Sequence, residues 1–323
     1  IFGYDNIPTL PVEGASQAGV NSEAMASLAD IRHRLVSRGF NEAITFSFVS
    51  PDAQALFDPD WVPVALKNPI SSDLAVMRTS LLPGLAGAAA HNIKRQITRV
   101  RFFETGLRFL PEASDLAQTP TLALILCGAR TPEGWSTQSD SVDFFDLKGD
   151  LEAVFESLRM DTLFKETSSP FLHPGKSSLI KTKNKLIGSM GVIHPNVMND
   201  KSLKDEVLVF TLDLDSLNEK RKIKYKNFSR YPISQRDLAF VVEDKISNTE
   251  IIKLIKAKAG KELVEIRTFD IYQGKNVPTG KKSVAFNLKW QSKSKTLIDE
   301  DVDAVVKKIV NSLSREIKAK LRS

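Results

Sequence analysis

The sequence predicts an α+β protein of two domains, and three observations support this prediction. With 323 residues, of which 42% are hydrophobic, the chain is long enough to form two packed cores. Between Asn68 and Phe109, a turn and a helix rich in Ala and Leu precede an apolar extended segment, which indicates a mixed α/β core. From residue 228 onward, the apolar patterns follow the order β-α-β-β-α-β, which is typical of a ferredoxin-like unit.

We divide the chain into four parts. Residues 1–16 are expected to be the remnant of an upstream domain or linker, since a start at Ile1 indicates a piece of something longer. Residues 17–217 make up the first domain and residues 228–323 the second. Between them, residues 218–227 read NEKRKIKYKN, which predicts a solvated basic linker because it has no apolar periodicity.

The first domain is expected to open with a helix followed by a strand. Asn21 and Ser22 are placed to cap the helix, apolar residues recur at helical spacing as far as Val36, and Gly39 ends it. A strand from Ala43 to Val49 follows. The other expected elements of this domain are a helix from Pro83, the strands Val100–Phe109, Leu122–Ala129 and Val207–Leu217, and the helix Gly149–Leu158.

Three carboxylates, Asp143, Asp146 and Asp150, lie close together in the sequence and suggest a divalent metal site. Their spacing differs from that of an EF-hand loop, which needs ligands at alternate positions and a closing Glu. Asp residues at the start of a helix more often cap it or interact with its dipole. We therefore expect capping residues here and no metal.

Two His-Pro pairs, at His173 and His194, flank a hairpin-like segment. No Cys lies nearby to complete a zinc site, so we expect each ring to order a turn through its nitrogens. The single cysteine, Cys127, lies in the apolar run LALILCGA and is expected to be a buried hydrophobic residue of a reducing compartment. No apolar run approaches the roughly 20 residues that cross a bilayer, and no signal peptide is evident. We therefore expect a cytoplasmic protein without a membrane partner.

The second domain shows the clearest periodicity. Alternate residues of its first and third strands are large and apolar, so they are expected to share the face on which both helices pack. These residues are Leu238, Phe240, Val242, Val284, Phe286, Leu288 and Trp290. The expected elements are the strands Arg236–Glu243, Leu263–Tyr272, Lys282–Gln291 and Ala319–Arg322 and the helices Asn248–Ala259 and Asp299–Arg315.

The opposite face of this sheet is predicted to be flat, small-sided and partly polar, which suits stacked bases although the aromatic residues of an RRM are missing. The distribution of charge also favours nucleic-acid binding. From Phe228 onward, 20 Lys and Arg stand against 12 Asp and Glu, a net charge of +8, while the whole chain carries +6. Such an asymmetry is typical of a nucleic-acid-binding appendage, and charge alone equally fits a Lys-rich solvated surface.

Several segments in register carry a resemblance to a known family. An MRTSLLPGL segment leads into an RxFExG strand, here RFFETG, and YPISQRDLAFVVE opens the second domain. Other segments in the same order are IFGYDNIP, RLVSRGFNEAITFSFVSP, FFDLKGDLEAVFESL, FLHPGKSSLI and GSMGVIHPNV. Over nearly its whole length the chain resembles the phenylalanyl-tRNA synthetase β subunit of the bacterial type.

The resemblance implies that the first domain is a copy of the class II aminoacyl-tRNA synthetase antiparallel sheet. Phe46 stands where motif 1 normally has a proline, and Leu110 stands near the ATP-directed arginine of motif 2. Arg101 and Arg108 do not fit the spacing of that motif, and motif 3 is not evident. A domain without these phosphate-binding groups is expected to be catalytically silent, with no catalytic residue of its own.

For the second domain, the resemblance implies a ferredoxin-fold anticodon-binding domain that holds the anticodon stem-loop of tRNA-Phe. The candidates for contacts to phosphates or base edges are Arg236, Lys282 and Lys289. Asp270 and Tyr272 are candidates for base recognition or stacking. The alternatives are packing at a strand end for Tyr272 and simple solubility for the lysines.

The resulting hypothesis is a non-catalytic scaffold and tRNA-binding portion of a ligase. The resemblance implies a catalytic α subunit as partner in an α2β2 heterotetramer, and ATP and magnesium for the complete enzyme but no cofactor on this chain. A self-sufficient class II ligase would need the missing arginines. A free-standing RNA-binding paralogue that acts without an α subunit remains an open alternative.

Overall fold

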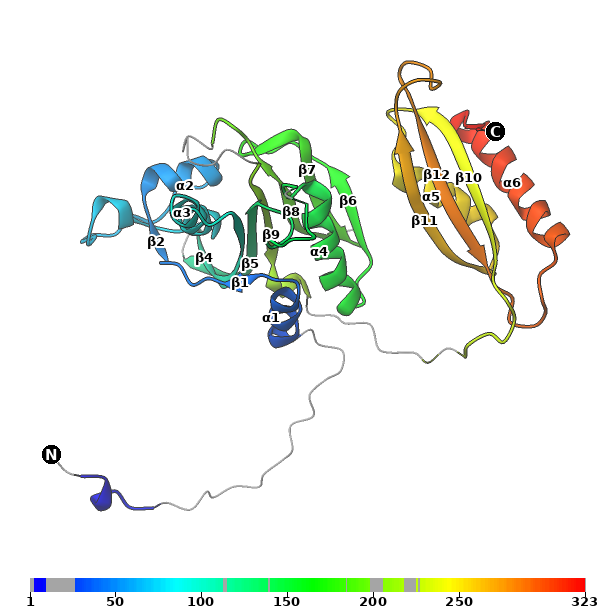
Figure 1. The fold of residues 1–323 in the computed structure, drawn as a ribbon. Coiled ribbons are helices and arrows are strands. Elements are labelled where there is room, and N and C mark those ends of the chain that lie inside the picture. The colour runs from blue at the N-terminus through cyan, green and yellow to red at the C-terminus, as the bar shows by residue number, and fades with distance from the viewer. Residues whose placement is uncertain are drawn as a thin grey trace. The chain divides into compact units, whose positions relative to one another are not determined.

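The computed structural model describes most of the chain. The described residues are 3–9, 27–112, 115–138, 140–183, 185–197, 206–217, 225 and 227–322. They fall into two compact units, Ile1–Ile223 and Lys224–Ser323, which are described separately (Figure 1). The expected helix cap at Asn21 and Ser22, and all but two residues of the expected linker 218–227, lie outside the described residues.

The first unit is built on a seven-stranded sheet in the order β1-β4-β5-β9-β8-β7-β6. Only β1 and β4 run parallel; the other neighbours are antiparallel. In chain order the strands are β1 (Asn41–Glu42), β4 (Arg99–Pro111), β5 (Leu116–Gly128), β6 (Thr162–Glu166), β7 (Leu172–Thr182), β8 (Lys185–Ile193) and β9 (Leu208–Asp213). Two short strands, β2 (Phe48–Val49) and β3 (Val76–Met77), form a separate antiparallel pair.

Helices cover both faces of this sheet, as Figure 1 shows. On one face lie α1 (Leu28–Ser37) and α4 (Phe144–Ser157), and on the other α2 (Pro51–Phe57) and α3 (Leu82–Ile93). Short 3-10 turns occur at Tyr4–Asn6, Ser72–Leu74 and Leu214–Leu217. The central strand β5 is therefore enclosed on both sides, which explains its unbroken apolar run.

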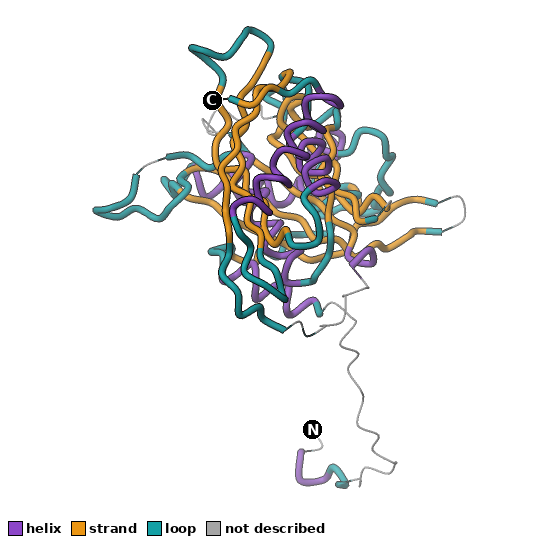
Figure 2. Tube along the Cα trace, turned by 90° about the vertical axis from the view of Figure 1, so that its right-hand side faces the viewer, coloured by secondary structure: helices purple, strands orange, loops and turns teal. Residues whose placement is uncertain are grey.

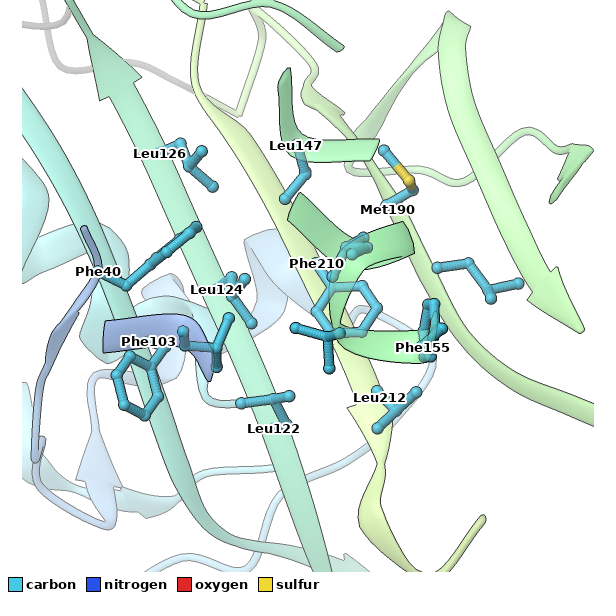
Figure 3. Close-up of a cluster of buried hydrophobic side chains, with 14 of the residues drawn as sticks. Phe40, Phe103, Leu122, Leu124, Leu126, Leu147, Phe155, Met190, Phe210 and Leu212 are labelled. Atoms are coloured by element: carbon cyan, nitrogen blue, oxygen red, sulfur yellow. The ribbon is translucent and has the colours of Figure 1, made fainter. Parts of the chain in front are cut away.

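The core on the α1–α4 face is drawn in Figure 3. Phe103 and Leu124 pack there with Phe210, whose ring meets Phe155 of α4 edge-on at 6.5 Å between centroids. On the other face, Cys127 packs beneath α3 and is only 1% exposed. The expectation that this cysteine is a buried hydrophobic residue is confirmed.

The predicted strand Ala43–Val49 is wrong before Phe48, since only Phe48 and Val49 form a strand, β2. Ala43 still donates its N–H to the carbonyl of Phe103 on β4 at 2.8 Å, and the backbone then leaves the sheet. Thr45 is held instead by Glu104, whose carboxylate accepts from the Thr45 N–H at 3.3 Å and from its hydroxyl at 2.7 Å. The contact with Glu104 on β4 thus prevents the strand that the alternating sequence predicted. The local sequence pattern does not reveal this contact.

Among the other boundaries that differ from the sequence prediction, β5 begins at Leu116 and not at Leu122, and two further differences have a side-chain cause. Helix α4 starts at Phe144 and not at Gly149, because Asp143 caps it. Strand β9 ends at Asp213, and the predicted continuation to Leu217 is a 3-10 turn in which the Asp213 carboxylate accepts the N–H of Asp215 at 2.9 Å. In both places a side-chain bond to the backbone sets the end of the element.

The second unit has the predicted order of elements. These are β10 (Ser234–Glu243), α5 (Asn248–Lys258), β11 (Leu263–Tyr272), β12 (Lys281–Trp290), α6 (Asp299–Ile317) and β13 (Lys320–Leu321). The four antiparallel strands lie in the order β11-β12-β10-β13. The predicted βαββαβ arrangement is confirmed, and Figure 2 shows its helices and strands in a second view.

The core of this unit confirms the predicted alternation. All seven alternating apolar residues of β10 and β12 belong to one buried cluster, together with Ile251, Ile255, Ile309 and Leu313 of the two helices. The indole of Trp290 is 2% exposed and donates to the carbonyl of Ala259 at 3.0 Å. One face of the sheet is thus filled by α5 and α6. The other face, called the open face below, has no helix of this unit on it, but its central residues Ser283, Ala285 and Asn287 are only 3%, 7% and 8% exposed.

Candidate nucleic-acid interface

The open face of the four-stranded sheet carries the side chains that alternate with the buried ones. Register fixes its composition, because residues paired across strands share a face. It presents Gln235, Asp237, Ala239 and Val241 of β10, Ser283, Ala285, Asn287 and Lys289 of β12, and Glu265, Arg267, Asp270 and Tyr272 of β11. The surface is small-sided at its centre and polar at its margins, as the sequence predicted.

Polar contacts order this face. The amide of Asn287 donates to the carboxylate of Asp237 at 2.6 Å, and the ammonium of Lys289 lies 2.8 Å from Glu265. The hydrogen bond to Lys289, followed by its charge, lowers the pKa of the Glu265 carboxyl, although desolvation opposes this. Ala239 and Ala285 face each other between these pairs. The face therefore combines a flat centre with fixed hydrogen-bonding groups.

Arg322 crosses the open face from the β13 edge. Its N–H donates to the carbonyl of Ala239 at 2.8 Å, its guanidinium to the hydroxyl of Ser283 at 3.3 Å, and its Cζ lies 5.5 Å from the ring centroid of Tyr272. An arginine over a tyrosine ring is a cation–π pair and also a platform on which a base can stack. Sequence reasoning missed Arg322, since only strand order brings it to Tyr272.

The backbone next to Tyr272 leaves room for its hydroxyl group. Gly274 has a φ of +151°, which side-chain-bearing residues rarely adopt, and a Cβ there would lie 2.9 Å from the Tyr272 hydroxyl. The β11 strand is irregular between Thr268 and Asp270, where Phe269 is 49% exposed. Asp270 and Tyr272 thus lie at the solvent-exposed end of an edge strand.

The structure separates the five predicted contact residues. Asp270, Tyr272 and Lys289 share the open face, whereas Arg236 and Lys282 lie on the side of the helices. The alternation that buries Leu238 and Val284 places Arg236 and Lys282 on the same side as those residues. The contacts of all five residues with tRNA stay predictions.

Arg236 and Lys282 make structural contacts on their side. Arg236 bridges to the start of α6, with distances of 2.6 Å to Asp299 and 3.2 Å to Asp303. The hydrogen bond to Asp299 is the main cause that raises the pKa of Arg236, with Asp303 adding to it and burial opposing it. Lys282 donates to the carbonyl of Asp244 at 2.6 Å. These contacts fasten a helix and a turn to the sheet.

In the first unit, the three clustered carboxylates do not converge on a common point. Asp143 and Asp146 form a capping box, as expected: the Asp143 carboxylate accepts the Asp146 N–H at 2.9 Å, and Asp146 accepts the Asp143 N–H at 2.8 Å. Asp150 is buried and pairs with Arg101 and with Arg38. Within the described ranges no group of three or more His, Cys, Asp or Glu side chains is arranged to hold a metal.

The two His-Pro turns confirm the predicted role of their rings. The Nδ1 of His173 accepts the Gly175 N–H at 3.1 Å, and the Nδ1 of His194 accepts the Asn196 N–H at 3.2 Å. The two rings are stacked with centroids 6.4 Å apart. The Nδ1 atom of each ring is thus engaged in holding its own turn.

The two segments that carry the family resemblance meet at a buried ion pair. Arg78 of MRTSLLPGL is 4% exposed and Glu104 of RFFETG is 2% exposed, with 2.6 Å between guanidinium and carboxylate. Arg78 also donates to the carbonyl of Leu107 at 2.9 Å. A Cβ on Gly106 would lie 2.4 Å from the Arg78 guanidinium, so a larger residue there would displace this guanidinium. These segments hold the fold together.

An exposed apolar surface lies where the 43–46 backbone leaves the sheet. Ile44 is 93% exposed and Phe46 is 73% exposed. Together with Phe48, Leu74 and Pro83 they line a shallow hollow of about 420 Å³. Large apolar side chains gathered in one exposed hollow are typical of a protein–protein contact.

Comparison with known proteins follows the same division into two parts. Residues 7–214 match the family described as phenylalanyl tRNA synthetase beta chain CLM domain, and residues 229–322 match the ferredoxin-fold anticodon binding domain. The chain is 40% identical over 324 residues to the phenylalanine–tRNA ligase beta subunit of Pseudomonas putida. It is 41% identical over 324 residues to that of Pseudomonas syringae pv. tomato and 39% identical over 327 residues to that of Vibrio cholerae.

These alignments cover 100% of this chain and 41% of each relative, so the chain spans about two fifths of the length of the curated relatives that it matches. In the part of the chain that the structure describes, no helix is both long and apolar enough to cross a membrane.

Proposed function

The chain belongs to the phenylalanyl-tRNA synthetase beta-chain family, and on that premise we propose that it is the scaffold and tRNA-binding portion of such a subunit. The complete enzyme attaches phenylalanine to tRNA-Phe with ATP and magnesium, and adenylation belongs to the catalytic α subunit. This chain supplies no catalytic residue and holds no cofactor in this proposal. The assembly is an α2β2 heterotetramer in the cytoplasm.

The second unit holds the anticodon stem-loop in this proposal. The observation that carries it is the open sheet face of a domain that matches an anticodon-binding family. Tyr272 and Arg322 offer a stacking platform, Lys289 a positive charge, and Asp270 an acceptor for a base edge. Lys289 is paired with Glu265, and the pair lies on the open face. Arg236 and Lys282 act through the fold, since they lie on the helix side and contact α6 and Asp244.

The first unit is a catalytically silent copy of the class II synthetase sheet in this proposal. Its large, mainly antiparallel sheet supports this assignment, and so do the buried positions of Arg78 and Arg101. Arg78 and Arg101 are paired with Glu104 and Asp150, so neither guanidinium is available to a nucleotide phosphate. Leu110, near the motif 2 position, has no charge to offer. Activation of the amino acid therefore falls to the partner subunit.

The partner subunit docks on the apolar hollow around Ile44 and Phe46 in this proposal. Obligate interfaces resemble a domain core cut in half, and two side chains of this size exposed by more than 70% fit that description. The departure of the backbone at 43–46, held by Thr45 and Glu104, is what turns these side chains outward.

The proposal is tested by binding experiments with tRNA-Phe and a cognate α subunit. Tyr272→Ala is expected to weaken tRNA binding about tenfold, since stacking contributes ~1–3 kcal/mol per base. Lys289→Ala should weaken binding and reduce its salt dependence by about one phosphate contact. Arg236→Ala is the matched control, because it removes a positive charge from the same sheet but on the helix side. It should leave the affinity for tRNA within a factor of about two.

The α-subunit interaction is tested separately by co-purification of the chain with Ile44→Ser and Phe46→Ser. Loss of the complex with retained tRNA binding supports both halves of the proposal. If the unaltered chain binds tRNA but no α subunit, the free-standing RNA-binding paralogue becomes the better description. If Arg236→Ala and Tyr272→Ala weaken tRNA binding equally, the open face is not the interface.

A further inference from the structure

Aromatic rings and cations together line a hollow next to the start of β10 in the second unit. Its volume is about 560 Å³. The residues that line it are Tyr225, Asn227, Phe228, Arg230, Tyr231 and Lys293. None of these lining residues carries a carboxylate. A hollow that combines ring faces with positive charge favours a ligand that is both aromatic and anionic.

The rings and the charges of this hollow are accessible. Phe228 is 91% exposed and Tyr225 is 81% exposed, and neither belongs to the hydrophobic cluster of the unit. Arg230 and Lys293 are exposed as well, and neither forms an ion pair with any residue that the structure describes. A phosphate can therefore approach both cations without breaking an internal contact.

Hydrogen bonds fix the backbone around the hollow. The hydroxyl of Ser229 donates to the carbonyl of Ser292 at 2.6 Å and accepts the N–H of Tyr231 at 3.1 Å. The side-chain amide of Gln291 donates to the carbonyl of Tyr231 at 2.7 Å. Ser292 is only 2% exposed, so the anchor is buried. The segment with the rings is thereby held beside the turn that follows β12.

The combination of residues favours RNA over a protein partner. Sites for single-stranded nucleic acid combine a positively charged groove with aromatic side chains on which bases stack. Protein–protein interfaces, in contrast, are depleted of Lys, and Lys293 is one of the two cations here. From Phe228 onward the chain carries a net charge of +8, which attracts a polyanion to this unit.

The hollow is separate from the stacking platform on the open face. Tyr272 pairs with Ser283 near the start of β12, whereas Lys293 lies just beyond Trp290, the last residue of this strand. From Ser283 to Trp290 the strand rises about 23 Å, at ~3.3 Å per residue. One nucleotide cannot contact both places, so the hollow is a second site.

We propose that this hollow binds one unpaired nucleotide of an RNA chain, with its base stacked on Phe228 and its phosphate on Arg230 and Lys293. Tyr225 and Tyr231 supply further ring surface beside the base. The site adds a second RNA contact to this unit. It uses none of the residues assigned to the open face, so it does not depend on that face binding the anticodon.

Fluorescence anisotropy of the full chain with a labelled oligouridylate of about six nucleotides tests the stacking contact. Phe228→Leu keeps an apolar side chain but removes the ring, so it should weaken binding about tenfold. Phe228→Trp keeps a ring and should bind at least as tightly as the unaltered chain. Trp135→Ala is the matched control, because it removes a 100% exposed ring of the first unit and should leave the affinity unchanged.

A salt titration of the same complex tests the phosphate contact. Arg230→Met and Lys293→Met should each reduce the slope of log K against log salt by about 0.7, the value for one phosphate of a single strand. Phe228→Leu should lower the affinity and leave this slope unchanged. Lys256→Met on α5 removes an exposed lysine outside the hollow and serves as the control for charge.

Binding of tRNA-Phe separates this inference from the proposed function. If both sites bind, the losses from Phe228→Leu and Tyr272→Ala should add, because the two residues lie far apart. A loss with Phe228→Leu alone supports the hollow and removes the open face as an interface. A loss with Tyr272→Ala alone overturns the present inference and leaves the proposed function intact.

Two further results would overturn the inference. The first is that the oligouridylate does not bind the unaltered chain. The second is that Phe228→Leu binds it as tightly as the unaltered chain does. Because leucine preserves apolar contact but not stacking, the second result would make a protein contact the better explanation for the exposed ring.

Discussion

The Arg78–Glu104 pair shows how a single contact holds the first unit. Both side chains are buried, and Thr45 completes the network through bonds to each of them. Removing one partner of such a pair leaves a buried charge without a counter-ion. This destabilises the fold far more than replacing both partners by apolar residues does. Arg78 and Glu104, from the two segments that carry the family resemblance, thus have a structural role.

We predict that Glu104→Leu destabilises the chain by ~3–5 kcal/mol, because Arg78 is left buried and unpaired. Urea unfolding measures the loss. Glu152→Leu is the control, since its pair with Lys148 is half-exposed and its removal should cost about 0.5 kcal/mol. The double variant Arg78→Met with Glu104→Leu should regain part of the loss. A double variant less stable than Glu104→Leu alone contradicts this account.

A second residue makes stability depend on pH. Burial raises the pKa of the Asp58 carboxyl, although the hydrogen bond from Thr79 and the charge of Arg108 act to lower it. The folded chain therefore binds this proton more tightly than the unfolded chain does. Ionisation of Asp58 opposes folding above the raised pKa, and this cost disappears as the pH falls below the usual value for Asp.

We predict that Asp58→Asn stabilises the chain at neutral pH and that its advantage shrinks as the pH is lowered through the raised pKa. The Asn side chain keeps an oxygen for the Thr79 hydroxyl, so the hydrogen bond is retained. Melting temperatures across a pH series measure the effect, with the exposed Glu133→Gln as control. An advantage that is constant at every pH would show that the carboxylate charge is not its cause.

At the scale of elements, the start of α4 depends on its capping box. The Asp143 carboxylate satisfies the N–H groups of Phe145 and Asp146, and Asp146 returns a bond to the Asp143 backbone. The same carboxylates bind Arg130, and the hydrogen bond to Asp146 is the main cause that raises the pKa of this arginine. The cap fixes where the helix begins and therefore how Asp150 meets Arg101.

We predict that Asp143→Ala costs ~1 kcal/mol, the usual loss of an N-cap side chain. Asp140→Ala is the matched control, because Asp140 also contacts Arg130, at 3.6 Å, but caps no helix. Denaturant midpoints of the two variants separate the cap from the ion pair. Equal losses would assign the stability to Arg130 and not to the cap.

At the scale of the whole molecule, the two units have separate hydrophobic cores. The cluster around Phe103 and Phe210 and the cluster around Leu85 and Val209 share no residue with the cluster around Phe240 and Phe286. Each cluster is closed by helices of its own unit, so neither requires the other to bury its apolar surface.

We predict that residues 224–323 fold alone. The amide NMR spectrum of this piece should overlay that of the full chain, except near its new end, and it should unfold in one cooperative transition. A piece that gives a collapsed spectrum with few dispersed signals would show that the second core depends on the first unit. Residues 1–223 provide the complementary control.

The sequence alone determined what depends on local pattern. Alternation in β10 and β12 located the second core, the order of apolar segments predicted the βαββαβ unit, and Asp143, His173 and His194 were correctly expected to hold local structure. These features depend on residues a few positions apart, and propensity and capping act over that range.

Only the tertiary structure decided which distant residues meet. Glu104 displaces the predicted strand at Thr45, Arg101 pairs with Asp150, and Arg322 lies over Tyr272, each because strand order and register bring together segments far apart in sequence. Local periodicity specifies which face a side chain occupies, while the register between strands specifies what it touches there.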